Sequence, residues 1–269
     1  LNSYRIENEK YRENEFEYSY NAFVNPRLGI NWNMSPTTFF YSQLSVTNRE
    51  PQITSLYDAA DAVGIGYWPG IQPQFDTTAT GDLDFSSPLI QPEKVTDFEF
   101  GFGTSKNNVM IQANLFYMKF NNELLVSELL YGYAPKYDNI DESLHYGVEV
   151  NTALQLNQNV KMKSNLSLNE SKILVYSDST EFEGNKIAGF PSVIFNGGID
   201  FRFKDLILNG TIKFIGKQFT SNDNTEELSV DPYSNIDIGL FYDAKNIYPG
   251  LQLNFHINNV LNDLYATYG

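Results

Sequence analysis

The chain has 269 residues, no cysteine, and 33 Asp and Glu against 18 Lys and Arg, for a formal net charge of −15. The lack of cysteine excludes a disulfide scaffold and thiolate chemistry. The negative charge argues against nucleic-acid binding, because polyphosphates need a basic surface. With 18 Tyr and 20 Phe, the chain needs a core, a binding surface or a membrane interface to house its aromatic rings.

Hydropathy alone suggests a soluble protein, with a mean hydropathy of −0.35. No stretch approaches the roughly 18–20 apolar residues of a spanning helix, and no signal peptide opens the sequence. A membrane β-barrel would give the same profile, since its lipid-facing residues alternate with polar ones. The order of apolar and polar residues along the chain therefore has to distinguish a soluble protein from a membrane β-barrel.

Apolar and polar residues alternate with a period of two in segments along the whole chain. In the last of them Leu253 and Phe255 fall on one side, and Asn254 and His256 on the other. We expect about ten strands of about ten residues, the length that crosses a bilayer when tilted. The expected strands are 27–34, 37–46, 97–103, 109–118, 147–156, 160–169, 192–203, 206–215, 235–242 and 251–257.

Short and long connections alternate strictly between these strands. The short polar turns are 35–37, 105–108, 157–159, 204–205 and 243–250, and the long segments are 47–91, 121–143, 170–191 and 217–234. Alternation of residues alone leaves two interpretations open: a membrane barrel around a wet lumen, or a secreted β-sandwich that binds carbohydrate. The alternation of connections favours the barrel, with short periplasmic turns and long extracellular loops.

Several segments resemble TonB-dependent outer-membrane receptors. One is QPEKVTDFEFGFG, with a Pro-Glu pair entering a Glu-x-Gly strand, and another is the Gly-Val-Glu hairpin that begins HYGVEV. No single motif is specific, but together they follow the family's order over nearly the whole chain. The segments that carry the resemblance are 25–51, 91–103, 145–173, 186–203, 215–240 and 251–269.

The resemblance implies an all-β fold: a partial antiparallel transmembrane β-barrel with about ten strands of a 22-stranded receptor barrel. Residues 1–269 would form the C-terminal portion of the barrel domain, without the plug domain and the last strand. The implied function is active transport of a scarce ligand, most simply a ferric siderophore or similar chelate, across the cell outer membrane. The implied partners are outer-membrane lipid, the energy-transducing protein TonB acting through the plug domain, and the small-molecule ligand. A passive outer-membrane porin is the alternative within the membrane.

Exposed aromatic residues in the long segments are candidate ligand contacts, because rings stack on siderophore rings or sugar faces. They are Tyr67 and Trp68 in 47–91, and Tyr131, Tyr133 and Tyr137 in the predicted loop 129–137. Packing within each loop is the alternative role.

Arg49, Arg202 and His256 are expected to face the lumen. His145 is expected to be a solvated residue of the lumen or rim. Two histidines are too few and too far apart for a metal-ligand motif. No nucleophile elbow or HExxH motif occurs, so we predict neither an enzyme nor a cofactor.

Overall fold

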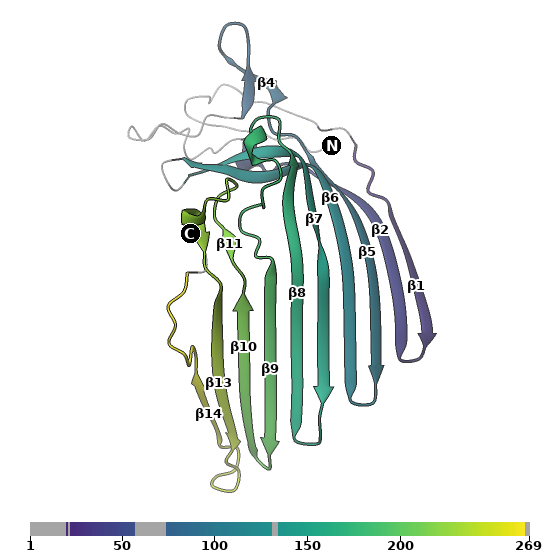
Figure 1. The fold of residues 1–269 in the computed structure, drawn as a ribbon, viewed down its shortest axis with the longest axis vertical. Helices are drawn as coiled ribbons and strands as arrows, with labels where there is room; N and C mark the ends of the chain where they lie inside the picture. Colours follow the sequence, from purple (N-terminus) through teal and green to yellow (C-terminus); the bar gives the residue numbers. More distant parts are fainter. Residues whose placement is uncertain (1–19, 21, 57–73, 131–133, 267–269) are drawn as a thin grey trace.

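Residues 20, 22–56, 74–130 and 134–266 are described by the computed structural model. Ten strands form one antiparallel sheet in the order β1-β2-β5-β6-β7-β8-β9-β10-β13-β14, which curves as an open wall (Figure 1). The all-β prediction is confirmed. The strands of the sheet are β1 (Arg27–Ser35), β2 (Thr38–Arg49), β5 (Glu93–Lys106), β6 (Val109–Leu130), β7 (Ala134–Gln155), β8 (Val160–Val175), β9 (Val193–Phe203), β10 (Leu206–Ile215), β13 (Tyr233–Asp243) and β14 (Gln252–Ile257).

Smaller elements lie in the connections between these strands. They are α1 (Ile53–Leu56), β3 (Phe75–Thr77), β4 (Leu83–Pro88), η1 (Thr180–Phe182), β11 (Gln218–Phe219), η2 (Glu226–Leu228) and β12 (Ser229–Val230). Strand β3 pairs with β4, and β11 pairs with β12. Among the described residues no helix is long and apolar enough to cross a membrane.

All five short turns lie at one end of the sheet, the lower end in Figure 1, and the longer connections lie at the other. The predicted alternation of short and long connections is therefore confirmed except between β6 and β7. Two of the turns hold a non-glycine residue in the left-handed region, Asn107 with φ 54° and Lys204 with φ 53°. Tight two-residue hairpin turns require positive φ, which Asn accepts more readily than Lys.

The strands are less uniform than the expected ten residues. They range from 6 residues in β14 to 22 in each of β6 and β7. The segment 121–143 was expected to be a long loop, and this was wrong. Pairing of β6 with β7 continues to Leu130 opposite Ala134, so most of the segment is a hairpin that extends past the other strands. Backbone pairing continues there without the alternating sequence that a half-buried strand shows.

One face of the sheet is apolar and uncovered. Leu28, Leu44, Phe98, Tyr117 and Tyr146 lie opposite one another across five strands, and directly opposite residues share a face. These residues are 39–68% exposed. The same face continues through β8–β14 with exposed Leu168, Ile199, Phe201, Phe203, Leu208, Ile238, Leu253, Phe255 and Ile257.

This uncovered face decides between the two interpretations of the sequence. In a β-sandwich a second sheet would bury it, since soluble monomers rarely leave apolar patches of this extent in water. In the described part of the chain the other sheets have two strands each, and the face stays open. An uncovered apolar face of this kind is typical of a barrel wall in contact with membrane lipid.

A small apolar core lies at the end of the long connections rather than under the sheet. Ile140, Ile173, Tyr176 and Ile187 are buried against one another, with Leu125 and Phe182 packed alongside. It joins the β6–β7 extension to the connection between β8 and β9. The connections at this end are therefore held by packing as well as by backbone bonds.

Candidate functional site: the polar face and the long connections

The polar face of the sheet lies opposite the apolar one. One row across it contains Tyr41, Gly101, Asn114 and Glu149. The ring of Tyr41 lies flat over Gly101, where an added Cβ would stand 1.9 Å from a ring carbon. The hydroxyl group of Tyr41 then donates to Oδ1 of Asn114 at 3.0 Å. The Glu-x-Gly motif thus has a structural reason, because only glycine leaves room for this ring.

Arg49 ends β2 on the polar face, at the end of the long connections. Its guanidinium group makes a bidentate pair with Glu93, with Nε–Oε1 and Nη2–Oε2 both at 2.9 Å. Glu93 also accepts the backbone N–H of Leu124 at 3.3 Å. Arg49 therefore links the end of β2 to the start of β5, and through Glu93 to β6, although 64% of its side chain stays exposed.

Arg202 and His256 also lie on the polar face, but far from Arg49. Arg202 is close to the turn between β9 and β10, beside an open hollow of about 850 Å³ that Gln155, Lys161 and Asp200 also line. His256 lies on β14 opposite Gly239. The three residues occupy different strands and do not form one site.

The candidate aromatic residues separate into two groups. Tyr67, Trp68, Tyr131 and Tyr133 lie outside the described residues. Tyr137 belongs to β7, where it pairs with Val126, and not to a loop as expected.

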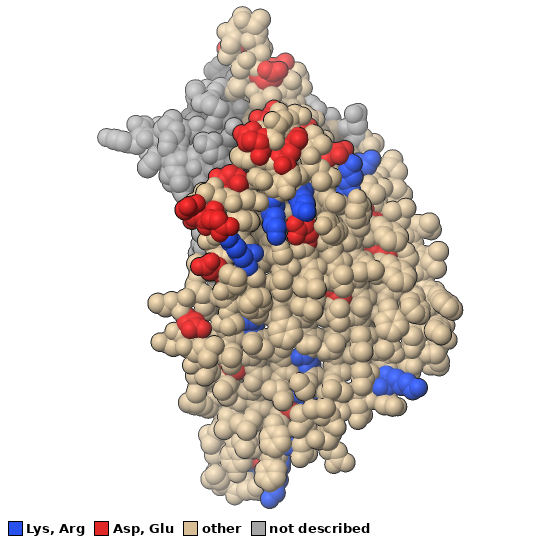
Figure 2. All heavy atoms as spheres, viewed as in Figure 1, with Lys and Arg blue, Asp and Glu red and all other residues tan. Residues whose placement is uncertain are grey.

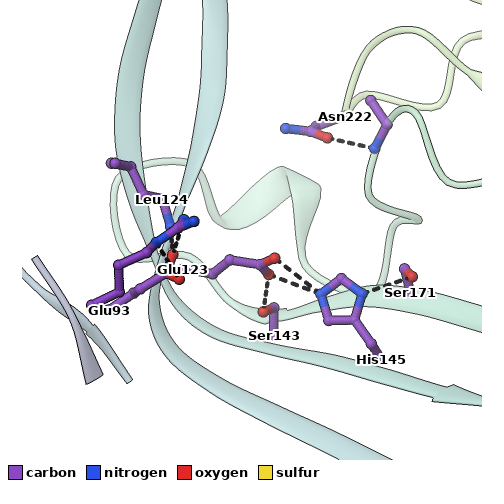
Figure 3. A network of polar contacts seen from close by, with 9 residues as sticks. Glu93, Glu123, Leu124, Ser143, His145, Ser171 and Asn222 are labelled. Carbon is purple, nitrogen blue, oxygen red and sulfur yellow. Dashed lines mark hydrogen bonds and ion pairs between the residues drawn. The ribbon is translucent and has the colours of Figure 1, made fainter. Parts of the chain in front are cut away.

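His145 is the centre of a buried polar network, drawn in Figure 3. Its Nε2 lies 3.0 and 3.1 Å from the carboxylate oxygens of Glu123, and its Nδ1 lies 2.8 Å from Oγ of Ser171. Ser143 donates a further hydrogen bond to Glu123. The rings of Phe120 and Phe190 pack edge-on against the imidazole, with centroids 5.1 and 5.2 Å away. The expectation of a solvated His145 was wrong, since only 7% of the residue is exposed.

Ser171, His145 and Glu123 are residue types of a hydrolase triad, but their burial gives them a different role. Ser171 is 6% and Glu123 is 7% exposed, so a substrate carbonyl has no path to the hydroxyl group. The network instead ties β6, β7 and β8 together, and through Phe190 it holds the connection that follows β8. No motif could reveal it, since it depends on the pairing of β6 with β7 and on the left-handed backbone of Asn122, where φ is 55°. Among the described residues no group of three or more His, Cys, Asp or Glu is placed to hold a metal ion.

Two long connections, 176–192 and 216–232, are joined by asparagine side chains. The amide group of Asn224 accepts the N–H of Lys186 at 2.7 Å and donates to its carbonyl at 2.8 Å. Oδ1 of Asn222 accepts the N–H of Ala188 at 2.9 Å, and Asn185 donates to the carbonyl of Asn222 at 2.9 Å. These bonds satisfy backbone groups that a loop would otherwise present to water. The two connections therefore form one ordered layer.

Asn224→Gly is expected to loosen this layer while the backbone stays unstrained, because glycine also accepts the φ of 57°. The two hydrogen bonds to Lys186 are lost, at about 0.5–1.5 kcal/mol each, together with a longer one to the carbonyl of Ser221 at 3.4 Å. Hydrogen–deuterium exchange at the amide groups of Lys186 and Ala188 should become about 10-fold faster or more. Asn246→Ala, in the turn between β13 and β14, is the control and should leave these amide groups unchanged. Unchanged exchange in Asn224→Gly would contradict the joined layer.

Acidic residues gather at the end of the long connections. The sequence ranges 47–91, 121–143, 170–191 and 217–234 contain 19 Asp and Glu against 5 Lys and Arg. Figure 2 shows Asp and Glu at this end of the molecule and few charges over the lower strands. This end of the molecule therefore presents a strongly negative surface.

Tyr176 lies among these acidic residues. The pKa of Tyr176 is raised, first by burial and then by the hydrogen bond that its hydroxyl group donates to Asp138 at 2.7 Å.

The geometry defines a class of protein: the wall of an outer-membrane barrel, with an apolar face for lipid and ordered connections at one end. The family model for TonB dependent receptor-like, beta-barrel proteins matches residues 2–260. The chain belongs to this family, whose barrels lie in the outer membrane. No curated protein sequence matches the chain.

Solved structures give the same fold at low sequence identity. The ferric yersiniabactin uptake receptor FyuA from Yersinia pestis aligns over 90% of this chain and 33% of its own, with a TM-score of 0.66 and 16% identity. The ferric citrate transporter FecA aligns over 93% and 35%, with a TM-score of 0.67 and 17% identity. The siderophore receptor PiuA from Acinetobacter baumannii aligns over 91% and 33%, also at 0.67 and 17%. The chain thus spans about a third of the length of these structures.

Proposed function

We propose that this chain is part of the barrel wall of an outer-membrane receptor that actively takes up a scarce ligand, a ferric siderophore or similar metal chelate. The observation that carries the proposal is the ten-stranded sheet of a TonB-dependent receptor, with ordered long connections at one end. Two structural neighbours, a ferric yersiniabactin uptake receptor and a ferric citrate transporter, support the choice of cargo. TonB would supply the energy through the plug domain, and residues 1–269 would be the C-terminal portion of the barrel domain.

Within this proposal the residues have separate roles. Tyr67, Trp68, Tyr131, Tyr133 and Tyr137 would contact the ligand outside the membrane. Arg49, Arg202 and His256 would face the lumen. The sequence ranges of the long connections carry a formal charge of −14, from 19 acidic and 5 basic residues, which favours chelates that are neutral or positive over polyanionic ones.

Uptake of radioactive iron by cells tests the proposal. Cells with the full-length receptor would be supplied with iron bound to citrate, a trihydroxamate or a triscatecholate. Uptake of at least one chelate should require the receptor and should stop when TonB is deleted. Receptor-dependent uptake that persists without TonB would support the passive porin instead, and an absence of receptor-dependent uptake across the three would contradict the ferric cargo.

A further inference from the structure

Three rows of residues follow one another up the apolar face of β6, β7 and β8. The lowest row is Leu115, Val148 and Leu168, and the middle row is Tyr117, Tyr146 and Glu170. Successive rows are two residues apart along each strand, or about 7 Å. The composition of the face thus changes from aliphatic to aromatic within one step toward the long connections.

The highest row is basic. Lys119 lies opposite Leu144, and Leu144 lies opposite Lys172. The backbone of Lys172 forms an isolated antiparallel β-bridge with Lys186 in the connection that follows β8. Because opposite residues share a face, the lysines stand above the tyrosines on the side that meets lipid. On the face that Figure 2 presents, Lys and Arg gather just below the acidic end of the molecule.

The lysines keep hydrogen-bond donors available. Lys119 pairs with Glu142 at 3.0 Å, while Lys172 and Lys186 share Glu170 at 3.3 and 3.6 Å. Lys186 also donates to Ser192 at 3.0 Å. An ammonium group has three donors, and these lysine side chains are 37–41% exposed. Two lysines therefore face one carboxylate, which leaves local positive charge in a region that is otherwise negative.

A shallow apolar groove lies directly below the lysines. It has a volume of about 510 Å³, and Leu115, Tyr117, Tyr146, Val148 and Leu168 line it together with Glu170 and Ser192. Ser192 is also the hydroxyl group that binds Lys186, so groove and lysines are continuous. An apolar groove with basic residues at its upper edge matches a lipid that has acyl chains and an anionic headgroup.

We propose that Lys119, Lys172 and Lys186 bind the phosphate groups of an outer-leaflet lipid whose acyl chains lie along the groove below them. The tyrosines occupy the interfacial level, where their rings meet both chain and headgroup. This site lies outside the wall and is separate from the uptake path. It rests on the membrane position of the apolar face and does not depend on the identity of the cargo.

Lipid binding to the full-length receptor in detergent tests the site by native mass spectrometry. The probes are bisphosphorylated lipid A, dephosphorylated lipid A with the same acyl chains, and inorganic phosphate. We expect the bisphosphorylated lipid to bind most tightly. The triple variant Lys119→Gln, Lys172→Gln, Lys186→Gln should weaken it about 100-fold, at roughly 5-fold for each lysine near the membrane surface.

A matched triple variant removes the same charge from the polar face of β8 and β10: Lys161→Gln, Lys163→Gln, Lys213→Gln. It should retain the affinity of the unmodified receptor. Heat-dependent gel mobility reports folding of each variant, and the single variants, each expected to lose about 5-fold, replace the triple one if it does not fold. The proposal is overturned if the matched variant weakens binding equally, if the site variants bind normally, or if the dephosphorylated lipid binds as tightly. Competition by inorganic phosphate at the same concentration would show a phosphate site without lipid specificity, and this too would overturn it.

Discussion

Replacing His145 with leucine is expected to lower the free energy of unfolding by about 3–5 kcal/mol. The imidazole is the hydrogen-bond partner of both carboxylate oxygens of Glu123, which is itself 7% exposed. Without it, Ser143 is the remaining side-chain donor to the carboxylate among the described residues. A buried charge that loses its partner costs far more than a surface ion pair contributes.

Urea unfolding of the full-length receptor in lipid vesicles measures this loss. His256→Leu is the matched control, since that histidine lies on an exposed strand surface and should change stability by about 0.5 kcal/mol or less. The double variant Glu123→Leu, His145→Leu should recover much of the loss, because neither polar group remains to be buried alone. Equal effects of the two histidine variants would contradict the network.

Gly101→Val is expected to destabilise the sheet by about 1–3 kcal/mol, the usual cost of overpacking. The new side chain would enter the space of the Tyr41 ring, whose carbons lie 1.9–2.6 Å from the Cβ position. The ring has to move away, and its hydrogen bond to Asn114 is then lost.

Two further variants separate this cause from a general intolerance of larger residues. Gly198→Ala on β9 should be nearly neutral, because the nearest atom to its Cβ position is 3.8 Å away. Adding Tyr41→Ala to Gly101→Val should reduce the cost of the valine, as the ring is no longer in its way. If the valine costs the same with and without Tyr41, the explanation of the Glu-x-Gly motif fails. Urea unfolding is again the measurement.

The strands could be predicted because their pattern is local. Phe98, Phe100 and Phe102 alternate within one segment, and a period of two needs no knowledge of the partner strand. The β6–β7 extension could not be predicted in this way. Its residues pair through backbone groups, and the sequence around 121–143 lacks the alternation that marks a half-buried strand.

The His145 network and the lysine row depend on register, which the sequence does not show. Glu123 meets His145 from 22 residues away because β6 and β7 stay paired through this region, with Asn122 in the left-handed backbone region. Lys119, Lys172 and Lys186 come together only when three strands and a connection are aligned. The aromatic ligand contacts were predicted from residue type alone. The sequence does not show the strand register that would bring such residues together, so the same limit applies to them.

The central claim is that the sheet spans the outer membrane with its long connections outside. The chain contains no cysteine, so single cysteines can report its topology in intact cells that produce the full-length receptor, freed of any other cysteine. A membrane-impermeant maleimide should label Asp178→Cys and Glu227→Cys in the long connections. Gln158→Cys and Asp205→Cys in the short turns should be labelled only after the outer membrane is permeabilised. Labelling of the short turns in intact cells, with the long connections protected, would contradict the account.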